Sequence, residues 1–113
     1  MKKVVYFAFQ KEKMCFMHII YNVLDLHEKG HTAKVVIEGA ATALIQPLIE
    51  ENNLLFKKVI ELGLIDSVCK VCAVQMGAFD YVKDHTNLKL EDEMLGHPPM
   101  EPYIKDGYQV ITL

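Results

Sequence analysis

Hydrophobic and polar residues alternate along the chain in runs that predict alternating strands and helices. Residues 4–9 are hydrophobic at every position, which is typical of a parallel strand covered on both faces. Residues 12–29 carry hydrophobic side chains at spacings of three and four, and Gly30 follows them. This spacing predicts a long amphipathic helix that ends at the glycine. Residues 32–38 predict a second strand.

The middle of the chain continues this alternation with shorter elements. Residues 42–51 favour a helix that Pro47 is expected to interrupt. The Asn52–Asn53 pair can cap a further helix over residues 54–62, and Gly63 provides its end.

The last part of the chain shows the weakest pattern. Residues 64–69 predict a short third strand, which leads into a helix that Gly77 ends. Residues 88–90 predict a brief strand within a stretch that otherwise shows no clear periodicity. A helix over residues 98–106 can start at two prolines, and residues 108–112 predict a closing strand.

This order of elements predicts the fold class. Strands and helices that alternate form an α/β fold, here a doubly wound, mainly parallel, five-stranded sheet of flavodoxin-like type with helices on both faces. The length predicts a single domain over residues 1–113. Ligands of such sheets bind outside the carboxyl ends of the strands. Three features fall at that edge: the turn after Phe9, the turn at Glu38–Ala40, and the pair of Cys69 and Cys72.

Composition narrows the range of functions. The hydrophobic fraction of 51% excludes intrinsic disorder and, for so small a domain, favours a homo-oligomer. All twelve basic residues are lysines and the net charge is −3, so direct binding of nucleic acid is not expected. No stretch has the length of a membrane span or the pattern of a signal peptide. We therefore expect no membrane partner and a cytoplasmic location, with the cysteines reduced.

The pair of Cys69 and Cys72 is the strongest candidate for chemistry. It stands where the third predicted strand gives way to a helix. Backbone N–H groups at a helix start favour negative charge, so we expect a lowered pKa for the Cys69 thiol. Such a thiol can serve as a nucleophile, a redox centre or a metal ligand. The alternative is that either cysteine packs as a small hydrophobic residue.

Four further residues are candidates for ligand binding near this pair. Lys70 can add positive charge beside the thiols. Glu38, which Gly39 follows, can act as a base or a hydrogen-bond acceptor at the end of the second strand. His97 precedes two prolines in a loop that can reach the site or a neighbouring subunit. The alternative for Lys70, Glu38 and His97 is an ordinary position on the solvated surface.

A zinc site is another interpretation. Cys15 and His18 lie three residues apart on the first predicted helix and share a face. That helix begins beside the edge that carries Cys69 and Cys72, and these four residues would suit a tetrahedral zinc ion. The alternative is that Cys15 and His18 belong to a polar stripe on a solvated helix, in which case no cofactor is expected.

Three segments carry a resemblance to a known family. Residues Cys69–Gly77 place two cysteines three apart and a glycine eight residues after the first. A glycine-led strand, Gly107–Thr112, closes the chain, and a β-α-β unit over residues 2–38 opens it. In these segments the chain resembles the DsrE/DsrF-like family of small cytoplasmic α/β proteins. The chain has a second cysteine, and it has Gln75 and Met76 before the glycine, where the best understood branch tends to have basic residues. In both respects it is similar to the Cys-x-x-Cys members of that family.

This resemblance implies a doubly wound fold, a homo-oligomer and sulfur handling. In the best understood branch, the cysteine eight residues before the glycine carries sulfur as a persulfide. The resemblance therefore implies that Cys69 carries or transfers persulfide sulfur, with Cys72 as its partner. It also implies a protein that donates or accepts the sulfur. Whether the chain acts as a sulfurtransferase or only as a carrier stays open.

Two other functions stay open as well. A Cys-x-x-Cys motif near β-α-β patterning is also typical of thiol–disulfide oxidoreductases, although here the motif comes late in the chain and encloses Lys70 and Val71. The remaining alternative is an oligomeric binding module without catalysis, whose cysteines line a small-molecule pocket or bind zinc.

Overall fold

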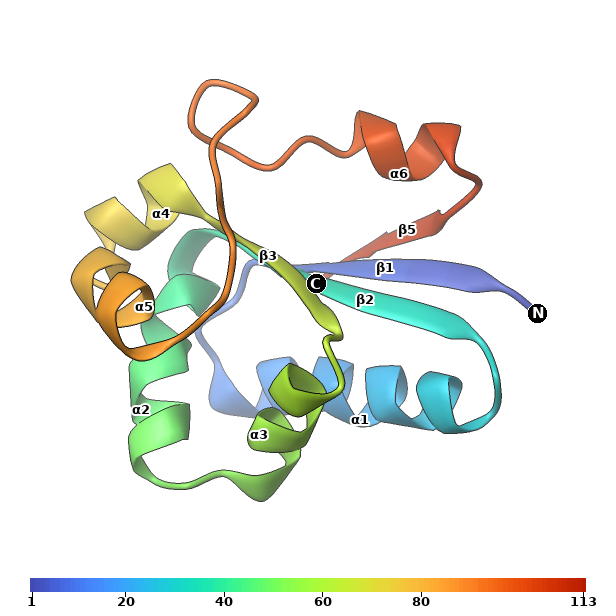
Figure 1. The fold of residues 1–113 in the computed structure, drawn as a ribbon, viewed down its shortest axis with the longest axis horizontal. Coiled ribbons are helices and arrows are strands. Elements are labelled where there is room, and N and C mark those ends of the chain that lie inside the picture. Colours follow the sequence, from blue (N-terminus) through green and yellow to red (C-terminus); the bar gives the residue numbers. More distant parts are fainter.

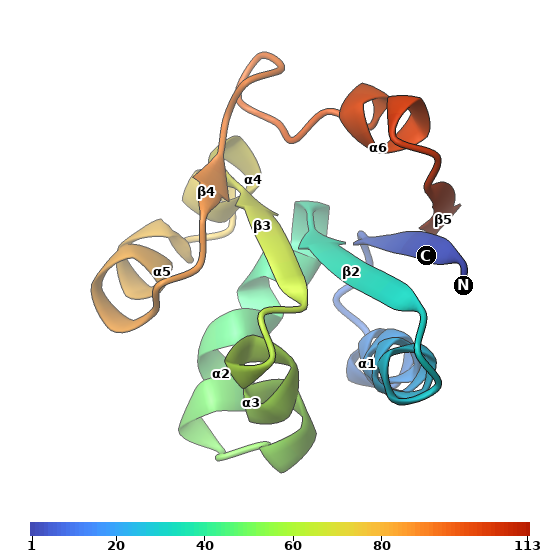
Figure 2. The same cartoon turned by 45° about the vertical axis from the view of Figure 1, so that its right-hand side comes forward.

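A sheet of five parallel strands forms the centre of the molecule. A computed structural model describes the whole chain, residues 1–113. The strand order is β4-β3-β2-β1-β5, and every neighbouring pair is parallel (Figure 2). The strands are β1 (Lys3–Ala8), β2 (Thr32–Ile37), β3 (Ile65–Cys69), β4 (Leu90–Glu91) and β5 (Gln109–Thr112). The predicted doubly wound, parallel α/β fold is confirmed.

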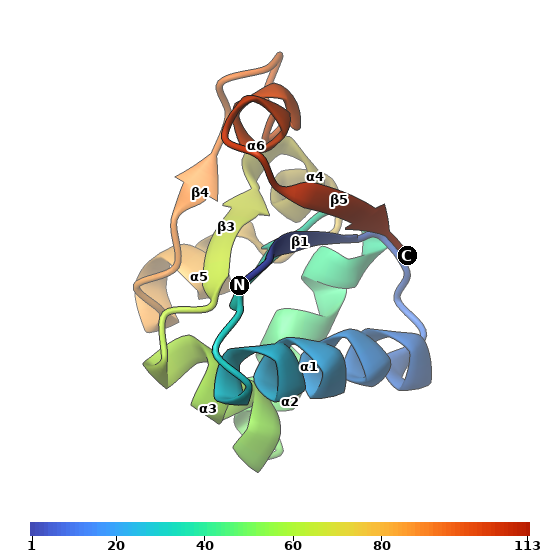
Figure 3. The ribbon, with the colours of Figure 1, turned by 90° about the vertical axis from the view of Figure 1, so that its right-hand side faces the viewer.

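The handedness of the crossovers decides where the helices lie. Parallel strands are joined by right-handed crossovers, and the chain crosses the sheet in one direction from β1 to β4. Helices α1, α2 and α3 consequently lie under one face (Figure 1), while the return from β4 to β5 places α6 on the other face (Figure 3). The helices are α1 (Lys13–Glu28), the 3₁₀ helix η1 (Gly39–Leu44), α2 (Ile45–Glu50), α3 (Leu54–Glu61), α4 (Lys70–Gln75), α5 (Phe79–His85) and α6 (Glu101–Lys105).

The two faces of the sheet bury unequal cores. The face toward α1, α2 and α3 holds a cluster of 22 buried residues, to which α4 and α5 add side chains. On the face toward α6, the buried hydrophobic cluster consists only of Val5, Phe7 and Val36. Phe7 meets the ring of Tyr103 on α6 edge to face, with the ring centres 5.7 Å apart. The side of the sheet that α6 covers is thus the less extensively packed of the two. The side chains that α1 buries are Phe16, Met17, Ile19, Ile20 and Val23.

Three helices differ from the sequence prediction. Helix α6 begins at Glu101, after Pro98 and Pro99, and the proline in its first turn is Pro102. Pro47 does not interrupt a helix, because η1 precedes it and α2 begins only at Ile45. The proline thus lies in the first turn of α2, where its missing N–H has no helical acceptor to lose. Helix α5 lies in the stretch without clear periodicity, and Val82 is its only buried residue. Its apolar face consists of Val82 and the partly buried Phe79, which is too short to show a helical period in the sequence.

A bulge in β3 sets the position of Cys69. The pairing between β2 and β3 skips Asp66, which is an extra residue in the strand. Asp66 and Ser67 both line a cavity of about 360 Å³ beside α6, where the Tyr103 hydroxyl donates a hydrogen bond to Asp66. Val68 returns to the main core, which leaves Cys69 as the last residue of the strand.

The sequence also led to expectations about membrane association, oligomeric state and location. None of the helices combines the length and the apolar character that crossing a membrane requires. The structure describes one chain, so the homo-oligomer stays a prediction, as does the cytoplasmic location.

The contribution of the main core can be measured at α3. Phe56 is fully buried, and its ring centre lies 5.8 Å from that of Phe16. We expect Phe56→Ala to lower the free energy of unfolding by about 3–5 kcal/mol, because it leaves a cavity that the neighbours cannot fill. Leu54→Ala on the same helix is the control, since Leu54 is 72% exposed and its loss should cost less than about 0.5 kcal/mol. Equal losses in urea unfolding would contradict this description of the core.

Candidate functional site

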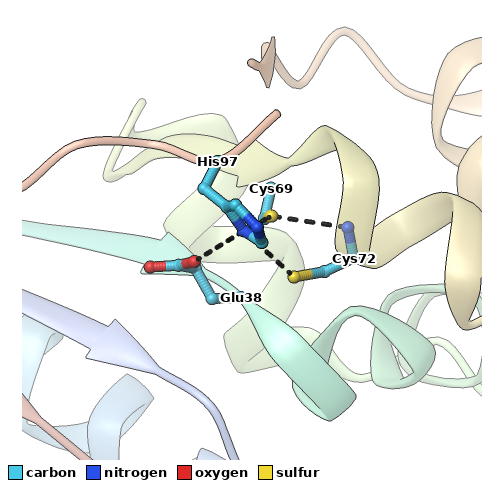
Figure 4. Close-up of side chains that lie close together, drawn as sticks. All are labelled: Glu38, Cys69, Cys72 and His97. Carbon is cyan, nitrogen blue, oxygen red and sulfur yellow. Dashed lines mark hydrogen bonds and ion pairs between the residues drawn. The ribbon is translucent and has the colours of Figure 1, made fainter. Parts of the chain in front are cut away.

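Four reactive side chains meet at the carboxyl edge of the sheet (Figure 4). Glu38 follows β2, Cys69 ends β3, Cys72 lies in the first turn of α4, and His97 lies in the loop after β4. One ligand atom from each residue lies within 4.8 Å of the other three. We call these four residues the edge cluster.

The imidazole of His97 contacts all three other members of the edge cluster. Its Nδ1 lies 3.2 Å from Cys69 Sγ, 3.7 Å from Cys72 Sγ and 3.8 Å from Glu38 Oε1. Glu38 and Cys69 are buried, Cys72 is partly buried, and the His97 side chain is 39% exposed. His97 therefore forms the solvent-facing side of the cluster.

The turn from β3 into α4 positions the two cysteines. Cys69 is the N-cap residue of α4, and its Sγ accepts a hydrogen bond from the N–H of Cys72 at 3.4 Å. The buried Thr42 hydroxyl donates to the carbonyl of Gly39 at 2.8 Å and also lies 3.4 Å from that of Cys72. This hydroxyl therefore joins η1 to α4. Gly77 follows α4 with a φ of +73°, as expected for a glycine that ends a helix.

The end of β2 positions Glu38. Its N–H donates to the carbonyl of Ala8 at 2.8 Å, which continues the pairing of β1 and β2 beyond the strands. Gly39 then turns the chain with a φ of +55°, and a Cβ there would lie 3.3 Å from the Phe9 carbonyl oxygen. Gly39 therefore shapes the turn that presents Glu38.

A two-residue turn brings His97 to the cysteines. Met94 and His97 exchange two backbone hydrogen bonds of 2.9 and 2.8 Å. The residues between them have positive φ angles, +51° at Leu95 and +95° at Gly96, which is the geometry of a type I′ turn. Leucine is unusual at such a position, so the sequence carried little sign of this turn.

Gly96 is the contact between this turn and α4. Its carbonyl accepts a hydrogen bond from the N–H of Val71 at 3.1 Å and lies 3.7 Å from Cys69 Sγ. A Cβ at Gly96 would lie 3.0 Å from the Cβ of Val71, so only glycine permits this approach. The sequence prediction placed His97 in a loop within reach of the site, and the structure brings it there from the same chain.

Burial reverses the protonation state expected for Cys69. Burial, reinforced by the thiol of Cys72 and the carboxylate of Glu38, raises the pKa of the Cys69 thiol to about 12, although the N–H of Cys72 acts in the opposite direction. The expectation of a lowered pKa is wrong because α4 has only six residues and the sulfur is fully buried. Burial also raises the pKa of Glu38, against the opposing effects of His97 and Cys69.

Three other candidates lie outside the edge cluster. Lys70 Nζ pairs with Asp92 at 3.3 Å and forms no hydrogen bond or ion pair with either cysteine. Cys15 and His18 are exposed on α1, because that helix turns its apolar stripe toward the sheet. The structure therefore does not bring Cys15 and His18 together with Cys69 and Cys72, as the zinc interpretation expected. Glu38 and His97 accompany the cysteine pair instead.

Two archaeal proteins are similar to this chain. MJ0733 of Methanocaldococcus jannaschii, described as an uncharacterized protein, is 33% identical over 100 residues, which cover 86% of this chain and 78% of the relative. The chain belongs to the family of this archaeal protein. An uncharacterized protein of Archaeoglobus fulgidus is 40% identical over 43 residues, which cover 38% of this chain and 70% of that relative. No family model matches the chain, and no solved structure matches it. Membership of the DsrE/DsrF-like family therefore stays a prediction.

Exposure predicts the order in which the three thiols react. Cys15 is exposed, Cys72 is partly buried and Cys69 is fully buried. Alkylation by iodoacetamide, followed by peptide mass mapping, should therefore modify Cys15 first, Cys72 second and Cys69 last. In urea the three rates should converge. Modification of folded Cys69 as fast as Cys15 would contradict the burial described here.

The turn at Leu95 provides a test of local strain. Leu95 is 95% exposed, so its side chain contributes little packing, yet it holds a left-handed conformation that disfavours leucine. We expect Leu95→Asn to raise the free energy of unfolding by about 0.5–1 kcal/mol, because asparagine tolerates this conformation. Leu95→Ala, which removes the side chain but keeps the strain, is the control and should leave stability nearly unchanged. A larger gain for alanine than for asparagine in urea unfolding would contradict this argument.

Proposed function

We propose that the edge cluster carries and transfers sulfur as a persulfide, with Cys72 as the point of entry and Cys69 as its partner. The observation that carries this proposal is that both sulfur atoms lie within 3.7 Å of one imidazole nitrogen of His97. An imidazole at this distance can take a proton from a thiol and return it later. The resemblance to the DsrE/DsrF-like family supports the same chemistry.

The exposure of the two thiols suggests their order of action. The resemblance implies Cys69 as the carrier, but its sulfur is fully buried. Cys72 is partly buried and lies in the first turn of α4. Cys72 is therefore the more accessible residue of the pair, and for this reason we assign the entry of sulfur to it.

Loading transfers one sulfur atom between thiols without net oxidation. The thiol proton of Cys72 passes to His97, and the resulting thiolate attacks the outer sulfur of a donor persulfide. The sulfur–sulfur bond of the donor breaks, a new sulfur–sulfur bond to Cys72 forms, and the donor takes the proton from His97 and leaves as a thiol, which returns the imidazole to its neutral form. An acceptor thiolate that attacks the outer sulfur then takes it in the same way, and Cys72 is released as a thiolate.

Cys69 provides a second outlet for the bound sulfur. Attack by the Cys69 sulfur on Cys72 Sγ forms a disulfide between the two cysteines and expels the outer sulfur as hydrosulfide. The thiol proton of Cys69 passes to the imidazole of His97. A dithiol reductant must then reduce the disulfide before the next cycle.

Mass spectrometry with cysteine variants tests this function. The full chain, in the presence of a chelator, is incubated with glutathione persulfide. We expect a mass gain of one sulfur atom on Cys72, lost in Cys72→Ser and kept in the matched control Cys15→Ser. The Cys69→Ser chain should load sulfur but release no hydrosulfide, because it lacks the attacking thiol.

Two outcomes would contradict the proposal. One is the absence of any sulfur gain on Cys72 in the Cys69→Ser chain when the exposed Cys15 of that chain gains sulfur. The other is conversion of the pair to a disulfide without release of hydrosulfide, which would identify thiol–disulfide exchange as the activity.

A further inference from the structure

We propose that Glu38, Cys69, Cys72 and His97 together bind one zinc ion per chain. They offer a carboxylate oxygen, two sulfurs and an imidazole nitrogen, all within 4.8 Å of one another. The proposal rests on this arrangement and is independent of the proposed sulfur chemistry, although both use the same cysteines.

The spacing of the ligand atoms is close to that of a tetrahedral site. Metal–ligand bonds of about 2.0–2.3 Å in a tetrahedron place neighbouring ligand atoms about 3.3–3.8 Å apart. In the edge cluster, His97 Nδ1 lies 3.2 and 3.7 Å from the sulfurs of Cys69 and Cys72 and 3.8 Å from Glu38 Oε1. The other three separations are no more than 4.8 Å, so movements of about 1 Å would let the four ligand atoms surround a single ion.

The charge of the ligands favours a divalent cation. In the form that binds metal, Glu38, Cys69 and Cys72 bring three negative charges to a site where two of the residues are buried. The nearest lysine along the chain, Lys70, pairs with Asp92 instead. Like charges without a counter-charge are strongly unfavourable in a buried site. A metal ion bound directly to these atoms compensates them.

The chemistry of the ligands selects the metal. Thiolates and imidazole favour zinc over magnesium and calcium, which prefer oxygen ligands. Four protein ligands without a vacant position are typical of a structural zinc site. The N–H of Cys72 donates to Cys69 Sγ at 3.4 Å, which orients that ligand from the surrounding shell. The exposed side of His97 provides a path by which the ion can enter.

Competition for zinc measures the site. The full chain is treated with a chelator, dialysed and titrated with zinc chloride against a chromophoric zinc indicator. We expect one zinc per chain and a loss of affinity of more than about 100-fold in Cys72→Ser and in His97→Ala, which exceeds the effect of outer-shell changes. Glu38→Gln should lose at least about tenfold. The chain with both Cys15→Ser and His18→Ala is the matched control and should bind zinc like the unaltered chain.

The absorption spectrum of cobalt(II) bound to the unaltered chain tests the site without relying on variants, which can fail to fold. Cobalt(II) in the edge cluster should give a thiolate charge-transfer band in the near ultraviolet and the visible bands of tetrahedral coordination. The proposal is overturned if the unaltered chain competes for no zinc, if cobalt shows no thiolate band, or if folded Cys72→Ser and His97→Ala chains retain full affinity. Loss of zinc binding in the Cys15 and His18 control would also overturn it, because it would locate the metal on α1.

The zinc and sulfur proposals can fail separately. Persulfide loading is measured on the chain held free of metal, and zinc binding on the chain that has met no sulfur donor. A chain that binds zinc but loads no sulfur refutes only the sulfur chemistry, and the reverse result refutes only the metal site. If both succeed, zinc should block persulfide loading, since the metal occupies the sulfur atoms that the donor must reach.

Discussion

The parallel pairing of β1, β2 and β3 is the constraint on which the edge cluster depends. Ile37 pairs with Ala8 on one side and with Val68 on the other. The next residues along the two strands, Glu38 and Cys69, therefore leave the sheet at the same level and beside each other. A shift of either strand by one residue would turn these side chains to the opposite face. The core that fixes this register thus also fixes the spacing of the carboxylate and the inner thiol.

A backbone contact outside the sheet helps to bring the remaining members of the edge cluster together. The hydrogen bond from Val71 N–H to the Gly96 carbonyl joins the first turn of α4 to the turn that carries His97. This contact holds the loop that carries His97 against the helix that carries Cys72. The close approach requires a glycine, and the preceding Leu95 adopts an unfavourable conformation to allow it. Local strain in this turn therefore accompanies the assembly of the site.

The sequence predicted the fold better than it predicted the site. Runs such as residues 4–9 and the stripe of α1 report burial directly, because the strand and helix periods are visible in them. The position of the cysteine pair could also be predicted, because a hydrophobic strand precedes it and a glycine ends the helix that follows it. Glu38 and His97 were named one by one, but their meeting depends on strand register and on the turn at Leu95, and neither is encoded in local spacing. The protonation of Cys69 was mispredicted because burial outweighed the short helix. Exposure of Cys15 and His18 followed from the same apolar stripe that identified their helix.

The unequal cores give the molecule a preferred order of local opening. Strands β1 and β2 contribute buried residues to both clusters, whereas the hydrophobic contacts of α6 and β5 are mainly with the small cluster around Phe7. Segments with few buried contacts open at a lower free energy than the whole domain. We therefore expect residues 98–113, whose pairing with β1 is their main link to the sheet, to open at a lower free energy than the four remaining strands. Because His97 directly precedes this segment, its opening would move the imidazole away from the two sulfurs. The rate of opening would then limit the dissociation rate of a ligand bound between them.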